Sequence, residues 1–191
     1  SFSIQRLAYV ASFIFFVGQK VLTAFISPIV PMEIRSSIET PDFSNLCLKS
    51  RKEIVQTYLK RDDKGLQRRV RKITESDKVF YTYTEKEFLS ALIRKEKEYE
   101  ITENEYESLL MQADEKLVPV IKVRYDFIYE NQLFELDVYS FNEKYAILEH
   151  EIDSPEQESF LPDFINVIKE VTDDSRYSNA ALAIAGEFPN Q

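Results

Sequence analysis

The sequence is poor in the residues that carry several common kinds of protein chemistry. Its 191 residues include one cysteine, one histidine, three glycines and no tryptophan. The single cysteine, Cys47, excludes an intramolecular disulfide framework and a cysteine-based metal site. The single histidine, His150, removes most histidine-based catalytic machinery, including Ser-His-Asp arrangements and histidine-rich zinc sites. With so few glycines, no glycine-rich phosphate loop can be written. If the protein binds phosphates, it does so with side chains.

Size and charge narrow the class of protein further. The length suits one domain of ordinary size, alone or with an appendage. The formal net charge of −9 argues against a nucleic-acid partner held by bulk positive charge. The 24 lysines and arginines still allow a local basic pocket. The lone cysteine fits a reducing compartment, so we expect a cytoplasmic protein. Because the net charge is negative, we expect no nucleic-acid partner. No residue pattern indicates an oligomeric state.

The N-terminal segment is strongly apolar over residues 7–30, with an interruption at Gly18 and Lys20. Its length suits a membrane span, although a lysine near the centre would cost roughly 2.5–3.5 kcal/mol. A signal peptide and a buried helix broken at the glycine are the other interpretations. We expect a helical unit over residues 1–30, separate from a domain over residues 31–191. Membrane contact through this segment is an alternative that we do not favour.

Pairs of like charges two positions apart recur along the rest of the chain. In a strand, residues i and i+2 point to the same face, so each pair aims two charges in one direction. The residues between and beside the pairs are often apolar, as Leu148 and Ile152 are. For any one pair the ordinary interpretation is a solvated face, but bases and acids recur together and favour a charged interior. The pairs are Arg69/Arg71, Lys122/Arg124, Glu96/Glu98, Glu135/Asp137 and Glu149/Glu151.

The residue pattern predicts a fold dominated by antiparallel strands. One helix is signalled by the capping box of Thr102 and Glu105, and a second is expected over Phe160–Glu170. Turns are expected at residues 62–65, 130–132 and 142–144. The candidate strands are Pro31–Ile38, Glu53–Leu59, Leu66–Ile73, Val79–Thr84, Ala91–Tyr99, Val118–Tyr129, Gln132–Tyr139 and Ala146–Asp153. We therefore predict an α+β fold with an eight-stranded antiparallel β-barrel, or tunnel, and flanking helices.

Several motifs occur in an order that resembles a known family. Residues from about 31 to 183 resemble the CYTH domain of the triphosphate tunnel metalloenzymes. Each motif alone is a weak signal, whereas their order over this length is a strong one. The motifs are Arg69-Val70-Arg71, Thr84-Glu85-Lys86, Arg94-Lys95-Glu96-Lys97-Glu98, Lys122-Val123-Arg124-Tyr125, Glu135-Leu136-Asp137-Val138-Tyr139, Ile147-Leu148-Glu149-His150-Glu151 and the stretch from Val171 to Asn179.

The resemblance implies a tunnel that binds a triphosphate-containing small molecule together with Mg²⁺ or Mn²⁺. The implied phosphate-binding residues are Arg35, Arg69, Arg71, Lys86, Arg94, Lys122 and Arg124. The implied metal ligands are Glu33, Glu135, Asp137, Glu149 and Glu151. Among them Glu33, Glu149 and Glu151 are the expected catalytic residues, and Glu96 and Glu98 are supporting acids. Catalysis in such a site would be electrostatic, with bases and metal neutralising the transferred phosphoryl group.

The chain departs from the family pattern on its first strand. The family opens with E-x-E-x-K, where this sequence has Pro31, Glu33 and Arg35. Arginine still holds a phosphate, often with two hydrogen bonds, but the loss of one carboxylate weakens one metal position. Two hypotheses follow. The first is a metal-dependent hydrolase of inorganic or organic triphosphate. The second is a non-catalytic regulatory module that binds polyphosphate or nucleotide, as part of a kinase- or ATPase-fused protein.

Overall fold

The computed structural model describes residues 11–17, 20–26, 32–63, 65–88, 94–152, 157 and 160–189. These residues form mainly strands, with two short α-helices and two 3-10 turns. The strands are β1 (Ala11–Val17), β2 (Lys20–Ile26), β3 (Met32–Glu39), β4 (Leu48–Leu59), β5 (Gln67–Glu75), β6 (Lys78–Phe88), β7 (Arg94–Ile101), β8 (Val120–Tyr129), β9 (Gln132–Tyr139), β10 (Asn142–Ile152) and β11 (Val167–Glu170). The helices are α1 (Glu103–Leu110) and α2 (Asn179–Ala185), and the 3-10 turns are η1 (Phe43–Asn45) and η2 (Ser175–Tyr177).

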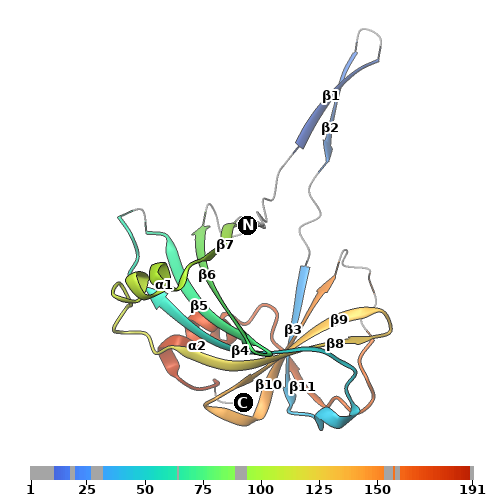
Figure 1. Ribbon diagram of the computed structural model, residues 1–191. Helices are drawn as coiled ribbons and strands as arrows, with labels where there is room; N and C mark the ends of the chain where they lie inside the picture. Colours follow the sequence, from blue (N-terminus) through green and yellow to red (C-terminus); the bar gives the residue numbers. More distant parts are fainter. Residues whose placement is uncertain are drawn as a thin grey trace.

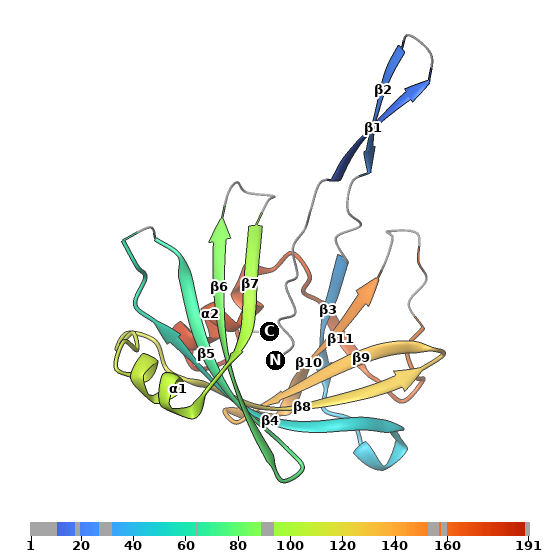
Figure 2. The ribbon, with the colours of Figure 1, turned by 45° about the horizontal axis from the view of Figure 1, so that its top comes forward.

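Nine strands form one antiparallel sheet in the order β11-β3-β10-β9-β8-β4-β5-β6-β7 (Figure 1). All eight strands expected after residue 30 are present, and β11 is an additional one. The sheet curves strongly, so that β7 and β3 rise on opposite sides of it (Figure 2). In the described part of the chain the sheet is not closed into a barrel. One physical reason is that β11 pairs with β3, from Val167 opposite Ile38 to Glu170 opposite Ser36, and occupies the edge that closure would need.

The second helix expected from the sequence is wrong. Residues 167–170 form β11 instead, and residues 160–166 contain no helix. Pairing with β3 satisfies the backbone of this segment, and the Val171 N–H donates to the Arg35 carbonyl oxygen at 2.8 Å. The actual second helix, α2, lies further on. It begins after Ser178, whose hydroxyl accepts from the Ala181 N–H at 3.2 Å, and ends at Gly186 with a φ of +69°.

The first helix and one hairpin turn are confirmed, and another turn is misplaced. Thr102 caps α1, and its capping box with Glu105 is complete. The turn between β8 and β9 uses left-handed conformations at Glu130 and Asn131, with φ values of 48° and 61°. The turn expected at residues 142–144 lies earlier, because Asn142 already belongs to β10.

The apolar N-terminal segment is a hairpin where the structure describes it, so the expected helix is wrong there. Strands β1 and β2 pair antiparallel, from Ala11 opposite Ile26 to Val17 opposite Lys20. The hairpin shares no strand pairing with the larger sheet in the described residues. No helix in the described part of the chain has both the length and the apolar character to cross a membrane. The rest of residues 1–30, and Pro31, lie outside the described residues.

The two faces of the large sheet are packed differently. On one face, α1 covers a cluster around Leu59, Val70 and Tyr106, and a second cluster surrounds Phe134 and Leu136. The other face, which we call the inner face, carries apolar residues mainly at one end. There the C-terminal segment with α2 packs on residues of four strands. That cluster comprises Tyr58, Val120, Tyr139, Ile147, Val171, Tyr177, Leu182, Ala183 and Phe188. The rest of the inner face carries mainly charged and polar side chains, together with the apolar row of Ile54, Ile73 and Phe80.

Candidate functional site

Strand register brings the predicted site residues to the inner face. Arg69 lies opposite Thr84, Arg124 opposite Asp137, and Glu149 opposite both Glu135 and Arg35. Cross-strand partners point to the same side of a sheet, so these charges share one surface. Several ion pairs on it also skip a strand, as Arg124 on β8 does with Glu149 on β10. Strands two apart are separated by roughly 10 Å, and side chains cross that distance most readily on a concave face.

A basic group lies on the wall formed by β5 and β6, facing acids on β7. Arg69 pairs with Glu96 at 3.2 Å and with Glu98 at 3.5 Å, and Arg71 pairs with Glu98 at 3.5 Å. Lys86 pairs with Glu96 at 3.0 Å. Burial, aided by the charge of Arg69, lowers the pKa of Arg71 to about 10. Burial raises the pKa of Glu98, but the charge of Arg71 and the hydrogen bonds of neighbouring donors outweigh it, so the pKa of Glu98 is lowered overall. The two acids therefore hold the basic side chains in place.

The centre of the inner face is a buried ion cluster around Arg124. Its guanidinium donates to Asp137 and Glu149 at 2.7 and 2.6 Å, and also to Glu135. Lys122 donates to the same Asp137, whose side chain is fully buried. Burial raises the pKa of Asp137, but Arg124 and Lys122 outweigh it and hold this pKa well below its usual range. Burial lowers the pKa of Lys122 to about 8, against the attraction of Asp137. Burial also raises the pKa of Glu135, which Arg124 only partly offsets.

Acids dominate the wall formed by β10 and β3. Glu33 lies directly opposite Glu151, and Glu149 directly opposite Glu135. Like charges directly opposite each other destabilise a sheet, and a cation between them would relieve this. Carboxylate oxygens are also the ligands that hard divalent cations prefer. Arg35 lies within this wall and pairs with Glu33 at 3.2 Å. The carboxylate oxygens of this wall are therefore chemically suited to bind a divalent cation.

The carboxylates of this wall are not gathered around a common point. Among the described residues, no group of three or more histidine, cysteine, aspartate or glutamate side chains has the arrangement of a metal site. Glu135 and Glu149 are both turned toward Arg124, as is Asp137. Asp137, whose oxygens both accept from bases, is the least suited of the predicted ligands. A cation would have to displace Arg124 from at least one acid.

The inner face also contains buried polar atoms that have no hydrogen-bond partner. Four such side-chain atoms occur in the described residues, and three belong to inner-face residues: Arg69 Nε, Thr82 Oγ1 and Asp126 Oδ1. Thr82 lies opposite Arg71, next to the basic group. A buried donor without an acceptor costs about 1–3 kcal/mol. The unpartnered donors of Arg69 and Thr82 are therefore suited to an anion bound on this face.

Several polar residues of the inner face lie outside the charge pairs that the sequence indicates. Gln56 accepts from Arg71 Nε at 2.8 Å and donates to the Tyr58 hydroxyl at 3.0 Å. Lys52 pairs with Asp126 at 2.5 Å, and Ser50 donates to the same carboxylate at 2.6 Å. The alternation along β4 was the available signal, because every second residue from position 50 to 58 shares the inner face. Each of these residues stands alone there, without a second like residue two positions away.

One predicted phosphate ligand is placed only by its backbone. Arg94 is the first residue of β7 and lies opposite Phe88, two positions before Glu96. Its side chain lies outside the described residues. The assignment of Arg94 as a phosphate ligand therefore stays a prediction from the sequence.

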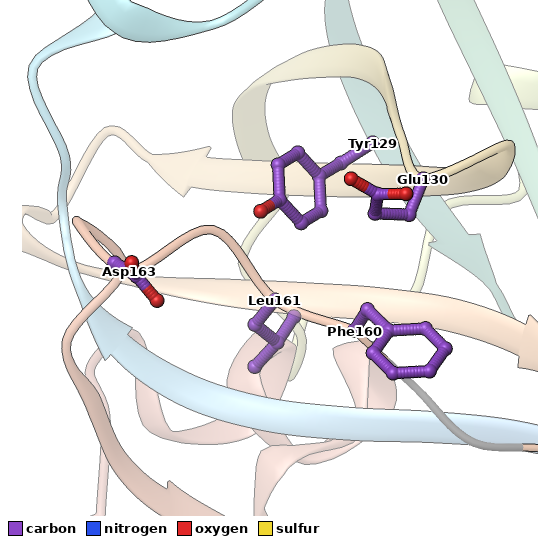
Figure 3. Close-up of a pocket in the computed structure, with 5 residues that line it drawn as sticks. All are labelled: Tyr129, Glu130, Phe160, Leu161 and Asp163. Carbon is purple, nitrogen blue, oxygen red and sulfur yellow. The ribbon is translucent and has the colours of Figure 1, made fainter.

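A separate pocket of about 540 Å³ lies away from these charges, between the β8–β9 turn and residues 160–163 (Figure 3). It is lined by Tyr129, Glu130, Phe160, Leu161 and Asp163. Its charged groups are two carboxylates and no base, so it does not fit a polyanion. The inner face, with its rows of bases, is the better candidate for the functional site.

Fold and site together define an antiparallel-sheet protein whose concave face can hold a polyanion through side chains alone. No model of a known protein family matches the chain, and no curated protein matches it. Solved structures are similar to it. The crystal structure of the inorganic triphosphatase NE1496 is 26% identical, covers 84% of this chain and 97% of its own, and superposes with a TM-score of 0.53. A second structure, described as hypothetical protein NE1496, is 26% identical with a TM-score of 0.55 and covers 84% of this chain and 100% of its own.

Proposed function

We propose that this protein is a CYTH-type triphosphate hydrolase that uses a divalent cation, Mg²⁺ or Mn²⁺. The observation that carries the proposal is the inner face, on which one wall is basic, the opposite wall is acidic, and Arg124 lies between them. The similarity to the inorganic triphosphatase NE1496 supports the same chemistry. An inorganic or organic triphosphate is the proposed substrate.

The proposed division of labour follows the two walls. Arg69, Arg71, Lys86 and Lys122 bind phosphate oxygens, and the unpartnered Arg69 Nε and Thr82 hydroxyl gain an acceptor when the anion binds. Arg124 exchanges one of its carboxylate partners for a phosphate oxygen. The released carboxylate is then available to the cation or the water. Preorganised bases of this kind stabilise the charge that spreads over the transferred phosphoryl group.

The acidic wall would hold the cation and orient the attacking water. Glu33, Glu149 and Glu151 would bind the metal with help from Glu135, while Asp137 remains a counterion of Lys122 and Arg124. When bound, a divalent cation supplies Lewis-acid polarisation of phosphate oxygens and charge neutralisation. A carboxylate of this wall accepts a hydrogen bond from the attacking water. Hydrolysis then forms a bond from the water oxygen to the terminal phosphorus and breaks the bond from that phosphorus to the bridging oxygen, which leaves on the remaining phosphates. The proton of the water passes to the carboxylate and from there to solvent.

The test is phosphate release from a panel of inorganic, nucleoside and thiamine triphosphates with each metal in turn. We expect turnover with Mg²⁺ or Mn²⁺, its loss on chelation, and its loss in the Glu149→Ala/Glu151→Ala variant. Glu53→Gln is the matched control, because Glu53 is an exposed acid on the other face of β4. No turnover in wild type despite tight triphosphate binding would contradict the hydrolase.

The basic wall has its own matched pair on one strand. Arg71 and Lys72 are adjacent on β5 and point to opposite faces. We expect Arg71→Ala to weaken triphosphate binding by about tenfold or more, since hydrogen bonds to charged groups contribute about 1.5–3 kcal/mol. Lys72→Ala should leave binding unchanged. Equal effects of the two changes would mean that the inner face is not the binding surface.

The second candidate is a module that binds polyphosphate or nucleotide without turnover. It is favoured by the absence, among the described residues, of three ligands arranged around one metal position. It is also favoured by Pro31, which stands where the family motif has its first glutamate. Pro31→Glu separates the two candidates. Activity that rises in this variant from a wild type that only binds would identify the natural chain as a binding module.

A further inference from the structure

The bases of the inner face follow a single strand. Arg69 lies opposite Tyr58 of β4, and Arg71 opposite Gln56. On the other side of the same strand, Lys122 lies opposite Ile54 and Arg124 opposite Lys52. The inner-face positions of β4 from 52 to 58 therefore each have a base beside them, two on β5 and then two on β8. From position 58 to position 52 this basic track is about 20 Å long, at 3.3 Å per residue.

Lys52 extends the track at its outer end. It is the one base of the track that lies on β4 itself, and its side chain is 28% exposed. The side chains of Lys122, Arg69 and Arg124 are only 1%, 9% and 14% exposed. Arg71 is 16% exposed, so Lys52 is the most exposed base of the track, although the exposure does not rise evenly along it. An anion entering from the exposed end would meet Lys52 early.

The present partner of Lys52 is a weak competitor for it. Lys52 pairs with Asp126 at 2.5 Å, and Ser50 donates to the same oxygen of that carboxylate. The second oxygen, Asp126 Oδ1, is buried and has no hydrogen-bond partner. On the other side, the register partner of Lys52 is Glu75 at the end of β5. One carboxylate carries less charge than a polyphosphate end group, so a bound polyphosphate can take Lys52 from Asp126 while Ser50 remains on the acid.

We propose that Lys52 is a further substrate-contacting residue, and that the site binds a linear polyphosphate extended along β4 with its outer end on Lys52. The inference rests on the proposed function, which it deepens by naming the substrate class: an extended chain of phosphates rather than a compact anion. Lys52 lies outside the charge pairs that the sequence offers. Its role follows from the register of β4 with β5 and β8 and from the pairing with Asp126.

The test is calorimetric binding of pyrophosphate, triphosphate and linear tetraphosphate to the full chain with Mg²⁺. The two variants for this test are Lys52→Gln, which keeps a hydrogen-bond donor for Asp126, and Lys52→Arg, which keeps the positive charge. Arg51→Gln is the matched control, because Arg51 lies next on β4 and points to the opposite face. Thermal unfolding of each variant checks that the fold is retained.

We expect Lys52→Gln to weaken tetraphosphate binding about tenfold, the low end for a charge-assisted hydrogen bond at a partly exposed site. Pyrophosphate, which the deeper bases can hold alone, should lose no more than about threefold. Lys52→Arg should bind within about threefold of wild type, and Arg51→Gln should bind as wild type does. Equal losses for the short and long ligands, or no loss, would overturn the role of Lys52 while triphosphate binding by wild type still stood. If wild type binds none of the ligands, both this inference and the proposed function fail.

Replacing Asp126 gives a second test, in which tetraphosphate binding is expected to become tighter rather than weaker. Asp126→Asn removes the competitor, so tetraphosphate binding should become tighter, and more so in wild type than in the Lys52→Gln background. Such a difference between backgrounds measures the coupling of the two residues. Equal tightening in both backgrounds would overturn the exchange of partners at Lys52.

Discussion

Replacing Asp137 with asparagine is the sharpest test of the buried ion cluster. The side chain of Asp137 is fully buried, and its carboxylate accepts from both Lys122 and Arg124. Arg124 keeps Glu135 and Glu149 when this charge is removed. Asp137 is the ion-pair partner that the structure gives Lys122, so Asp137→Asn leaves a buried ammonium without a counterion. Breaking a buried pair in this way costs about 3–5 kcal/mol.

The Lys122 part of this cost has an upper limit set by the proton on Lys122. The ammonium can escape by losing its proton, and in folded wild type the pKa of Lys122 is already lowered to about 8. At about 1.4 kcal/mol per pH unit, this escape limits the Lys122 part of the loss to roughly 1.4 kcal/mol at pH 7 and to almost nothing at pH 9, where Lys122 is mostly neutral in wild type as well. The lost charge-assisted hydrogen bonds between Asp137 and Arg124 add about 1.5–3 kcal/mol at either pH. We expect a total loss of about 3–4 kcal/mol at pH 7 that shrinks to about 1.5–3 kcal/mol at pH 9.

Urea unfolding of wild type and Asp137→Asn at both pH values measures these differences. Glu53→Gln is the control, because it removes an exposed carboxylate whose ion pair with Arg51 contributes about 0–1 kcal/mol. A loss below about 1 kcal/mol at pH 7 would refute the assignment of Asp137 as the essential counterion. A loss of equal size at both pH values would refute the part assigned to the Lys122 proton.

Three further outcomes follow from named contacts. His150 is buried against Phe134, and burial lowers its pKa, so the unfolded state binds a proton more readily. The unfolding free energy should therefore fall as pH drops below about 6.5, and His150→Gln should remove that part of the slope in urea titrations. Thr102→Ala breaks the capping box of α1 and should cost about 1 kcal/mol in the same assay. Because the pKa of Lys122 is about 8, triphosphate affinity measured by calorimetry should fall above pH 8, and less so in Lys122→Arg.

The features that local sequence predicts well are those set by neighbours along the chain. The capping box at Thr102 and Glu105 marks α1, and alternation marks the eight strands from β3 to β10. Alternation also places the charge pairs on one face without any knowledge of strand order. The order of the motifs then indicates which pairs belong to a common site.

The features that sequence missed depend on contacts between distant residues. Residues 160–170 have a helical spacing of apolar side chains, but pairing of 167–170 with β3 decides their conformation. The same pairing keeps the described sheet open, which no local pattern could reveal. Helix α2 did carry a signal, with Ser178 before it and Gly186 after it. The partner of each charge also depends on strand order, so the sequence could not show that Asp137 serves two bases.

The position of β3 between β10 and β11 has a consequence for folding. The Arg35 N–H donates to the Thr172 hydroxyl across 137 residues of sequence, so one edge of the large sheet assembles only after the chain is nearly complete. Contacts of such long sequence separation form slowly, because the entropy of closing the loop is lost before the contacts themselves contribute any stabilisation. Strands β4, β5, β6 and β8 need no such loop and can pair first, which brings the bases of the track together before Glu33 arrives. A folding intermediate would then be more basic on its inner face than the native protein, and anions such as polyphosphate in the refolding buffer should retain it longer.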